Sequence, residues 1–334
     1  MGNEFDKILK IIQGEIPLVK RPFLVLAKEL GLKETELLKV IEKLMEDSIV
    51  RQIAPIYDSK MLGYDSALVA FRVDKERLEK VANFINSCPG VSHNYERTHD
   101  FNLWFTLAVL PDTLSLEDIV KLMAKRTQTQ DYVVLRTVRM FKIGVKLDYE
   151  STLERGSFSV NTYTYIPLSD EEKKIVSVTQ GSIPLTERPF FEYAKKLSIS
   201  EEELLTKLRE FKERGILRRI SAILHHRRAG FVANAMSVWK VPEDSIEEVG
   251  SYIASFKGVS HCYERTTNES WKYNLFAMIH GKSMEDVQRL VERISGEKAL
   301  RDYVLLFSTR EFKKERIRYF SEDFDEWLRK ITSI

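Results

Sequence analysis

The chain has 334 residues, enough for two or more ordinary domains with cores of their own. Its composition is typical of a globular protein, with 43% hydrophobic and 31% charged residues, and a formal net charge of +2 means that any basic surface must be local. No apolar run reaches the ~18–20 residues of a membrane span, no secretory signal is evident, and two cysteines, Cys88 and Cys262, make neither a disulfide framework nor a cysteine-rich metal site, so we expect a cytoplasmic protein with no membrane partner.

Three short helices and a strand are the first predicted elements, over residues 4–56. Phe23, Leu26 and Leu30 recur at helical spacing and would line one buried face. The order helix, helix, helix, strand is the winged helix-turn-helix pattern. We therefore expect a domain of this type over residues 1–62.

A different pattern follows, in which strands and helices alternate. The predicted order is strand, helix, two strands, helix and strand, which is a ferredoxin-like unit. We expect this domain over residues 63–147. Residues 148–167 lack core periodicity and are interpreted as a linker.

The rest of the chain repeats the first half. IIQGEIPLVKRPFLVLAKELGL from Ile11 matches VTQGSIPLTERPFFEYAKKLSI from Val178, PGVSHNYER matches KGVSHCYER, and DYVVLRTVRMFK matches DYVLLFSTREFK. The order is kept and the offset stays between 167 and 172 residues, so chance similarity is excluded. The second copy is expected to form a winged helix-turn-helix domain at 168–229 and a ferredoxin-like domain with an extra C-terminal helix at 230–334. The fold class is α+β, a tandem duplication.

This domain order resembles the Lrp/AsnC family of transcription regulators, in which the first part binds DNA and the second dimerises and senses a ligand. A DNA-reading helix should be basic, because neutralising phosphates supplies most non-specific affinity. Residues 33–47 instead carry three basic against five acidic side chains, and residues 201–214 carry four against five. We therefore expect no DNA binding, and a transcription regulator remains an alternative.

Each copy carries a His-x-Tyr-x-Arg motif on a predicted strand. Alternation along a strand puts the three side chains on one face, where they offer a titratable acid, a phenol and a guanidinium that can bind a carboxylate. A lone histidine is most often structural, but the repetition of the motif favours a functional role. The candidates are His93, Tyr95 and Arg97 in the first copy and His261, Tyr263 and Arg265 in the second.

A second histidine cluster occurs in one copy only. The second copy has His225, His226 and Arg227 where the first has Asp58-Ser59-Lys60, so the fold does not require the histidines. A histidine pair on a solvated loop would be unremarkable, but here it belongs to a local basic cluster. The arginines preceding it are Arg218 and Arg219.

Other side chains could contribute on either copy. Aromatic residues beside a sheet are usually core, although they could stack on a flat ligand, and the arginines of the last strand of each copy could lie beside the histidine motif or in solvent. His280 is interpreted as mostly structural, and His99 is left undecided. The remaining candidates are Trp104, Trp271, Asn274, Arg139 and Arg310.

The second half, with RRISAILHHRRAGFVANAMSVW, VSHCYER and YNLFAMIHG, closely resembles one subunit type of siroheme decarboxylase. The first half, with MLGYDSALVAFRV, PGVSHNYER and HDFNLWFTL, is similar to the partner subunit type. The resemblance covers nearly the whole chain. It implies a fusion of two subunits, an intramolecular pseudo-heterodimer, for which further self-association stays open.

The resemblance implies a carboxy-lyase that removes CO₂ from the acetates on C12 and C18 of siroheme, by way of a mono-decarboxylated intermediate, to give 12,18-didecarboxysiroheme. The product would serve haem d1 or alternative haem biosynthesis. General-acid chemistry needs no added cofactor, since the substrate carries its own iron. His261, His226, Tyr263 and His93 are the expected catalytic side chains, and His226 is also a candidate iron ligand.

Siroheme has eight carboxylates, so the candidate arginines would bind it bidentately and the aromatic rings would contact the macrocycle. Because the first copy lacks the His225-His226-Arg227 run, we expect one principal site, centred on the second copy. The rival hypothesis is a tetrapyrrole-binding sensor without catalysis.

Overall fold

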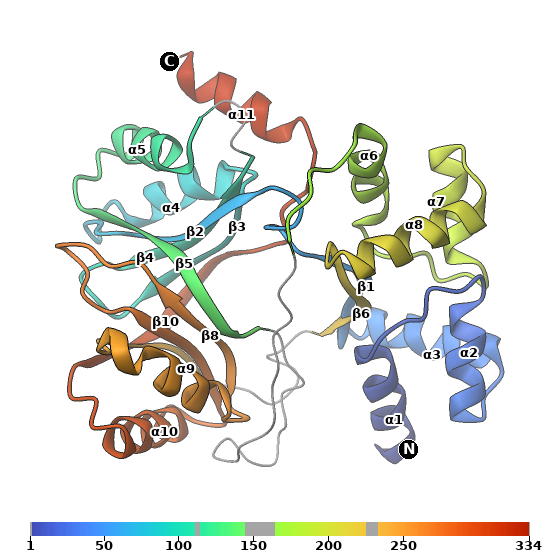
Figure 1. The fold of residues 1–334 in the computed structure, drawn as a ribbon, viewed down its shortest axis with the longest axis horizontal. Helices are drawn as coiled ribbons and strands as arrows, with labels where there is room; N and C mark the ends of the chain where they lie inside the picture. Colours follow the sequence, from blue (N-terminus) through green and yellow to red (C-terminus); the bar gives the residue numbers. More distant parts are fainter. Residues whose placement is uncertain (1, 111–113, 144–163, 225–232, 334) are drawn as a thin grey trace. The chain divides into compact units, whose positions relative to one another are not determined.

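The computed structural model describes residues 2–110, 114–143, 164–224 and 233–333, which form two compact units (Figure 1). The first unit contains α1 (Gly2–Gln13), α2 (Pro22–Leu30), α3 (Glu34–Glu46), β1 (Val50–Tyr57), α6 (Asp170–Thr179), α7 (Pro189–Leu197), α8 (Glu201–Glu213) and β6 (Leu217–Leu224). None of the helices in the described part of the chain is long and apolar enough to cross a membrane.

The second unit contains β2 (Asp65–Phe71), α4 (Leu78–Ser87), β3 (Val91–Arg97), β4 (Leu103–Val109), α5 (Leu116–Thr127), β5 (Tyr132–Lys142), β7 (Ala233–Trp239), α9 (Ile246–Ala254), β8 (Val259–Arg265), β9 (Leu275–Gly281), α10 (Met284–Glu297), β10 (Tyr303–Lys314) and α11 (Asp323–Thr332). The predicted fold class is confirmed, because each half runs through three helices and a strand and then through β-α-β-β-α-β.

The first unit is built from the helical parts of both copies. Their strands β1 and β6 pair antiparallel as a two-stranded sheet, with Ala54 opposite Ser221. The backbone N–H of Ile16 donates to the Ile220 carbonyl at 2.8 Å, and that of Ile183 donates to the Ile53 carbonyl at 2.7 Å. The segment that follows the first helix of each copy therefore bonds to the strand of the other copy. Neither copy completes this sheet alone.

The repeated letters Arg-Pro-Phe have a structural purpose in this unit. The guanidinium of Arg21 pairs with the buried carboxylate of Glu34, and Arg188 pairs in the same way with Glu201. The following proline occupies the first turn of α2 or α7, where its missing N–H costs no hydrogen bond. The shared motif therefore fixes the entry of the second helix in each copy.

The second unit is a closed eight-stranded barrel, in the order β10-β3-β4-β2-β5-β8-β9-β7. The strands β5 and β10 are long enough for each to pair with one strand of either copy. The first part of β5 pairs with β2 and its second part with β8, while β10 pairs with β7 and then with β3. The barrel therefore closes only when the ferredoxin-like halves of both copies are present.

Three apolar clusters fill this unit. One lies beneath α4, α5 and α11, and a second beneath α9 and α10. The third, which we call the central cluster, is made of residues from both copies that point away from the helices. Its buried members are Leu68, Ala70, Phe101, Trp104, Val133, Leu135, Met236, Val238, Trp271, Phe276 and Leu306.

The C-terminal helix α11 belongs to the second copy in sequence but packs on the core of the first. Trp327, Leu328 and Ile331 join the cluster beneath α4 and α5, and the indole N–H of Trp327 donates to Ser87 Oγ at 3.0 Å. Figure 1 shows α11 beside α5. The helix α11 therefore covers the apolar core of the first copy. Among the described elements, no equivalent helix covers the core of the second copy.

Replacing Gly250 with alanine should destabilise the second unit. A Cβ at Gly250 in α9 would overlap the ring of Phe141, the side chain that β5 of the first copy packs on this helix. Displacing the ring should reduce the free energy of unfolding by about 1–3 kcal/mol, the usual range for overpacking. Thermal and urea unfolding would measure it.

The control is Gly296→Ala in α10, where a Cβ would meet nothing within 4 Å. This variant should be neutral or gain up to ~1 kcal/mol from higher helix propensity. Equal effects from the two substitutions would contradict the packing argument.

Candidate active site

The structure brings the three side chains of each His-x-Tyr-x-Arg motif together as a stripe along one strand. On β3 the rings of His93 and Tyr95 are stacked with centroids 6.3 Å apart, and the Arg97 guanidinium lies 5.4 Å from the centre of the Tyr95 ring. On β8 the same contacts measure 6.1 Å from His261 to Tyr263 and 4.9 Å from Arg265 to Tyr263. We call these groups the first stripe and the second stripe.

Both stripes face the same side of their sheets as the central cluster. Tyr95 stands opposite Trp104 in the β3–β4 register, and Tyr263 stands opposite Phe276 in the β8–β9 register. Directly opposed residues project to the same side of an antiparallel pair, and both partners belong to the central cluster. The stripes of the two copies therefore border one common interior.

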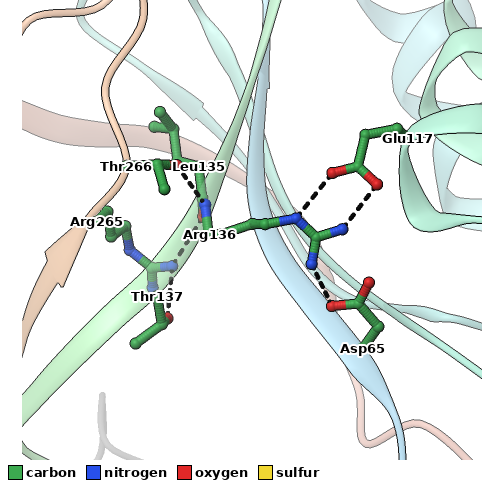
Figure 2. A network of polar contacts seen from close by, with 7 residues as sticks. All are labelled: Asp65, Glu117, Leu135, Arg136, Thr137, Arg265 and Thr266. Carbon is green, nitrogen blue, oxygen red and sulfur yellow. Dashed lines mark hydrogen bonds and ion pairs between the residues drawn. The ribbon is translucent and has the colours of Figure 1, made fainter.

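The arginine of each stripe is anchored on the last strand of the other copy. Arg265 Nη1 donates to the Leu135 carbonyl and to Thr137 Oγ1, both at 3.1 Å, as Figure 2 shows. Arg97 makes the equivalent bonds to the Leu306 carbonyl and Ser308 Oγ at 3.0 Å. The acceptors that hold each guanidinium in place are neutral in the part of the chain that the structure describes.

Each guanidinium therefore has no counter-charge among the described residues; Arg97 is buried and Arg265 is half-buried. The Nε atoms of Arg97 and Arg265 are buried and have no hydrogen-bond partner, and no ion pair reaches either residue from the described part of the chain. Burial lowers the pKa of each guanidinium to about 10, against a smaller opposing effect of the neighbouring tyrosine. Since buried charges are normally paired, the arrangement suits an anionic ligand.

A β-bulge adds a serine to each stripe. The register shifts between Val91 and His93 and between Val259 and His261, so Ser92 and Ser260 are the extra residues. Ser92 Oγ lies 3.0 Å from His93 Nδ1, and Ser260 Oγ lies 2.8 Å from His261 Nδ1. Each histidine is thereby oriented through Nδ1.

The two stripes differ in what lies behind the serine. Ser260 Oγ is also 2.7 Å from His280 Nε2, so one hydroxyl links two imidazoles. Ser92 Oγ is instead 2.9 Å from Thr106 Oγ1, and the first copy has Ala108 at the position of His280. The sequence interpretation of His280 as mostly structural did not include this contact and stays a prediction. The serine before the histidine is present in both copies, so the signal specific to this contact was His280 itself, at the position where the first copy has Ala108.

A carboxylate distinguishes the stripes further. Glu311 of β10 stands opposite Tyr95, and the Tyr95 hydroxyl donates to Glu311 Oε2 at 3.2 Å. The corresponding neighbour of Tyr263 on β5 is Met140. A negative charge therefore lies beside the first stripe, whereas an apolar side chain lies beside the second.

Three candidate binding residues have structural contacts instead. Trp104 and Trp271 are 1% and 2% exposed and contact each other edge to face at 5.1 Å within the central cluster. Neither ring has an open face for a flat ligand at this degree of burial. The Asn274 side chain bonds both the N–H and the carbonyl of Val241, at 2.8 Å each, and so ties two loops together.

Arg139 and Arg310 do not lie beside the stripes. In register they stand opposite Glu264 and Glu96, which alternate with the stripe residues and project to the other side of the sheet. Arg310 forms a two-bond ion pair with Glu79, and Arg139 pairs with Glu247 at 2.9 Å. Bulges between residues 137 and 139 and between 308 and 310 explain the difference, because they reverse the alternation expected from the sequence.

The basic cluster of the second copy is only partly described. Arg218 pairs with Asp58 at 2.6 Å, and Arg219 Nε donates to Ser221 Oγ at 3.2 Å; both belong to the first unit. His225, His226 and Arg227 lie outside the described residues.

The surroundings of His99 and of the two cysteines indicate their roles. His99 accepts a hydrogen bond from the Phe101 N–H at 3.0 Å and touches the edge of Trp271, and burial lowers the pKa of its imidazole. Burial raises the pKa of the Cys88 thiol to about 12, and it also raises that of Cys262. Neither thiol is suited to act as a nucleophile.

Comparisons with known proteins give the family. The AsnC-like ligand-binding domain matches residues 61–142 and 228–313, and the helix-turn-helix domain of the siroheme decarboxylase NirDL type matches residues 6–51 and 172–218. The chain is 70% identical over 333 residues to the siroheme decarboxylase of Hydrogenobacter thermophilus, covering 100% of both chains.

Solved structures agree with this match. The crystal structure of the siroheme decarboxylase NirDL is 65% identical, with a TM-score of 0.83 and 99% of each chain covered. The structure of NirDL in complex with an iron-uroporphyrin III analogue is 63% identical, with a TM-score of 0.82 and the same coverage. With matches of this identity along its whole length, the chain belongs to the siroheme decarboxylase family.

Proposed function

We propose that this chain decarboxylates siroheme at the acetates on C12 and C18, and that the reaction is centred on the second stripe. The observation that carries the proposal is the set of His261, Tyr263 and Arg265, in which the Tyr263 ring contacts the His261 imidazole on one side and, on the other, a half-buried guanidinium that has no counter-charge among the described residues. The complex of a close relative with an iron-uroporphyrin III analogue supports a tetrapyrrole with many carboxylates as the ligand.

Arg265 would bind one substrate carboxylate through its Nε edge. An incoming carboxylate supplies the counter-charge that the described residues lack, and a charge-assisted hydrogen bond to a buried guanidinium is among the stronger polar contacts. Arg97 would bind a second carboxylate of the macrocycle on the first stripe, more weakly because Glu311 lies beside Tyr95 there. Ligand binding would then offset the free-energy cost of burying both guanidinium groups, which otherwise lowers the stability of the protein.

His261 would be the general acid. In each decarboxylation the bond between the carboxyl carbon and the methylene carbon breaks, and CO₂ leaves without the bonding electrons. The electron pair remains on the methylene carbon, in conjugation with the pyrrole ring, until a proton forms the new C–H bond. Since Nδ1 of His261 is engaged by Ser260, the proton would come from Nε2.

One principal site agrees with the differences between the copies. The Glu311 carboxylate beside Tyr95 would repel an anionic substrate at the first stripe, whereas Met140 beside Tyr263 would not. The first stripe would then bind another part of the macrocycle. Trp104, Trp271, Asn274, Arg139 and Arg310 would act only indirectly, while Arg218, Arg219, Arg227 and His226, the candidate iron ligand, remain proposed parts of the site.

The finer features of the proposal follow from the same chemistry. The reaction needs a proton but no oxidant, so we propose that no cofactor is required beyond the iron that siroheme carries. We also propose a cytoplasmic enzyme that does not bind DNA, since α3 and α8 carry more acidic than basic side chains. The product would enter haem d1 or alternative haem biosynthesis.

Anaerobic incubation with siroheme, followed by mass spectrometry, tests the function. We expect stepwise loss of two CO₂, with a mono-decarboxylated intermediate between substrate and product. Omitting the protein, or denaturing it by heat, should leave siroheme intact. A shift in the siroheme spectrum without any loss of mass would instead identify a tetrapyrrole sensor, the second candidate function.

A further inference from the structure

We infer that Asn234 of β7 is a further substrate-binding residue, whose amide donates to a carboxylate of siroheme between Arg97 of the first stripe and His280 behind the second. The inference rests on the proposed function, because it adds a residue to the same site. Asn234 belongs to a line of polar side chains that crosses four neighbouring strands of the barrel. We call this line the polar row, and its members are Arg97 on β3, Ser308 on β10, Asn234 on β7 and His280 on β9.

The strand register places these four side chains on one side of the sheet. Ser308 stands opposite Arg97 in the β10–β3 pair, and Asn234 stands opposite His280 in the β7–β9 pair. Ser308 follows Phe307, the last printed partner of β7, and its hydroxyl is hydrogen-bonded to Asn234. Directly opposed residues of an antiparallel pair project to the same side. The row therefore crosses the interior face that also carries the two stripes.

Hydrogen bonds fix the orientation of the Asn234 amide. Arg97 Nη1 donates to Ser308 Oγ at 3.0 Å, and the Ser308 hydroxyl in turn donates to Asn234 Oδ1 at 3.2 Å. The amide oxygen is thus used within the row, and the Nδ2 group keeps both of its protons for another acceptor. Asn234 is exposed, and no acceptor from the described residues reaches its Nδ2. The Nδ2 group can therefore donate to a ligand, two hydrogen bonds away from the Arg97 guanidinium.

The surroundings of the row fit the edge of a tetrapyrrole that carries carboxylates. Asn234 and Ser308 each lie two residues from a buried member of the central cluster, Met236 and Leu306 respectively. An apolar surface therefore borders two donors, the Nδ2 of Asn234 and the Nε of Arg97, which is buried and has no hydrogen-bond partner in the described structure. A macrocycle with an apolar centre and anionic side chains has the same pattern. A carboxylate bound there would accept from the guanidinium and the amide together.

The other end of the row leads to the second stripe. His280 Nε2 lies 2.7 Å from Ser260 Oγ, and that oxygen lies 2.8 Å from Nδ1 of His261. A carboxylate on Asn234 would therefore hold the macrocycle near the proposed general acid of the second copy, while Arg97 contributes from the first copy. The row joins groups of both copies in one binding site, in agreement with one principal site.

Exchanging the two copies gives a matching row, which is interrupted. Its members are Arg265 on β8, Thr137 on β5, Ser66 on β2 and Ala108 on β4. Thr137 accepts from Arg265 at 3.1 Å, but a serine hydroxyl then takes the place of the Asn234 amide, and a methyl group takes the place of the His280 ring. Ser66 therefore provides a matched control for Asn234.

Equilibrium binding of iron uroporphyrin III to the full-length protein tests the inference through affinity alone, since this ring carries acetates and propionates like those of siroheme. Asn234→Ala removes the amide donors and should weaken binding about tenfold, within the range for a hydrogen bond to a charged group. Asn234→Asp keeps the acceptor for Ser308 but replaces the donors with a carboxylate, so binding should weaken by about 100-fold. Ser66→Ala should bind like the wild type.

A purely structural amide predicts the reverse order of the two variants. Aspartate would then preserve the contact with Ser308 and keep wild-type affinity, whereas alanine would lose it. That order would overturn the inference, and so would wild-type affinity in Asn234→Ala or an equal loss in Ser66→Ala.

Kinetics with siroheme separate this inference from the proposed function. A residue that binds a carboxylate equally before and during the reaction affects KM and not kcat, so Asn234→Ala should raise KM about tenfold and keep kcat within about twofold of the wild type. A lower kcat at an unchanged KM would contradict the binding role. An inactive wild type, whose affinity for iron uroporphyrin III still falls in Asn234→Ala, would contradict the proposed function alone.

Discussion

Replacing His261 with alanine should abolish decarboxylation, while the matched His93→Ala should merely weaken it. His261 is proposed to deliver the proton to carbon, so its loss should reduce kcat by about 10²–10⁴-fold, the usual contribution of a general acid. His93 occupies the same place on the first stripe, but with Glu311 near its neighbour Tyr95 and no second histidine behind Ser92. We expect less than about a tenfold loss there.

The measurement is CO₂ released per siroheme under anaerobic single-turnover conditions, with the mono-decarboxylated intermediate quantified separately. Both histidines are half-buried on equivalent strands, so the two variants should lose similar stability, and unfolding curves provide that control. Equal loss of activity from both variants would contradict one principal site. Arrest of His93→Ala at the intermediate would indicate that each stripe removes one carboxyl group.

The sequence predicted the elements of this fold well because the repeat doubled every signal. Hydrophobic spacing located the helices and strands of each copy, and the kept order of motifs established the duplication. The pairing of β1 with β6 was not predictable in the same way, since two wing strands with suitable edges do not reveal which partner they choose. The docking of α11 on the first copy was hidden for a similar reason: its apolar face could have covered either copy.

The candidate site could be predicted where side chains alternate regularly along a strand. The prediction failed where a bulge breaks this alternation. The residues of each stripe lie two apart on a regular segment, so their common face followed from the strand period. Bulges at Ser92 and Ser260 then turned a serine toward the histidine, and bulges on β5 and β10 turned Arg139 and Arg310 away. A bulge depends on the pairing of two strands, so a single-sequence period does not reveal it.

The burial of the two tryptophan rings could also not be predicted from the sequence. Trp104 and Trp271 come from different copies, and their contact exists only because the barrel is closed by both. Their alternatives, core or ligand platform, could be weighed but not decided from the pattern. The polar members of the stripes were easier to recognise, because their chemistry is unusual for a buried strand.

Replacing Arg265 with methionine should weaken siroheme binding by about 10- to 100-fold, the usual range for a lost charge-assisted hydrogen bond. Methionine keeps much of the apolar volume over the ring of Tyr263 but removes the guanidinium, which has no counter-charge in the described part of the chain. The matched Arg97→Met should have a smaller effect, because Glu311 already makes the first stripe less favourable for an anion. Anaerobic absorbance titration with siroheme measures both dissociation constants.

The pH dependence of binding gives an independent check on the same residue. Burial sets the pKa of Arg265 at about 10 in the free protein, so the guanidinium is charged at neutral pH and loses its proton as the pH rises through about 10. A bound carboxylate favours the charged form, so the affinity due to Arg265 should be constant while both the substrate carboxylates and the guanidinium are ionised, and should fall as the pH rises through about 10. In Arg265→Met, the affinity for siroheme should fall less at high pH than in the wild type, because the contribution of the guanidinium is already missing. If its dissociation constant matches that of the wild type throughout, the guanidinium does not bind a substrate carboxylate, and its burial serves only to join β8 to β5 through Leu135 and Thr137.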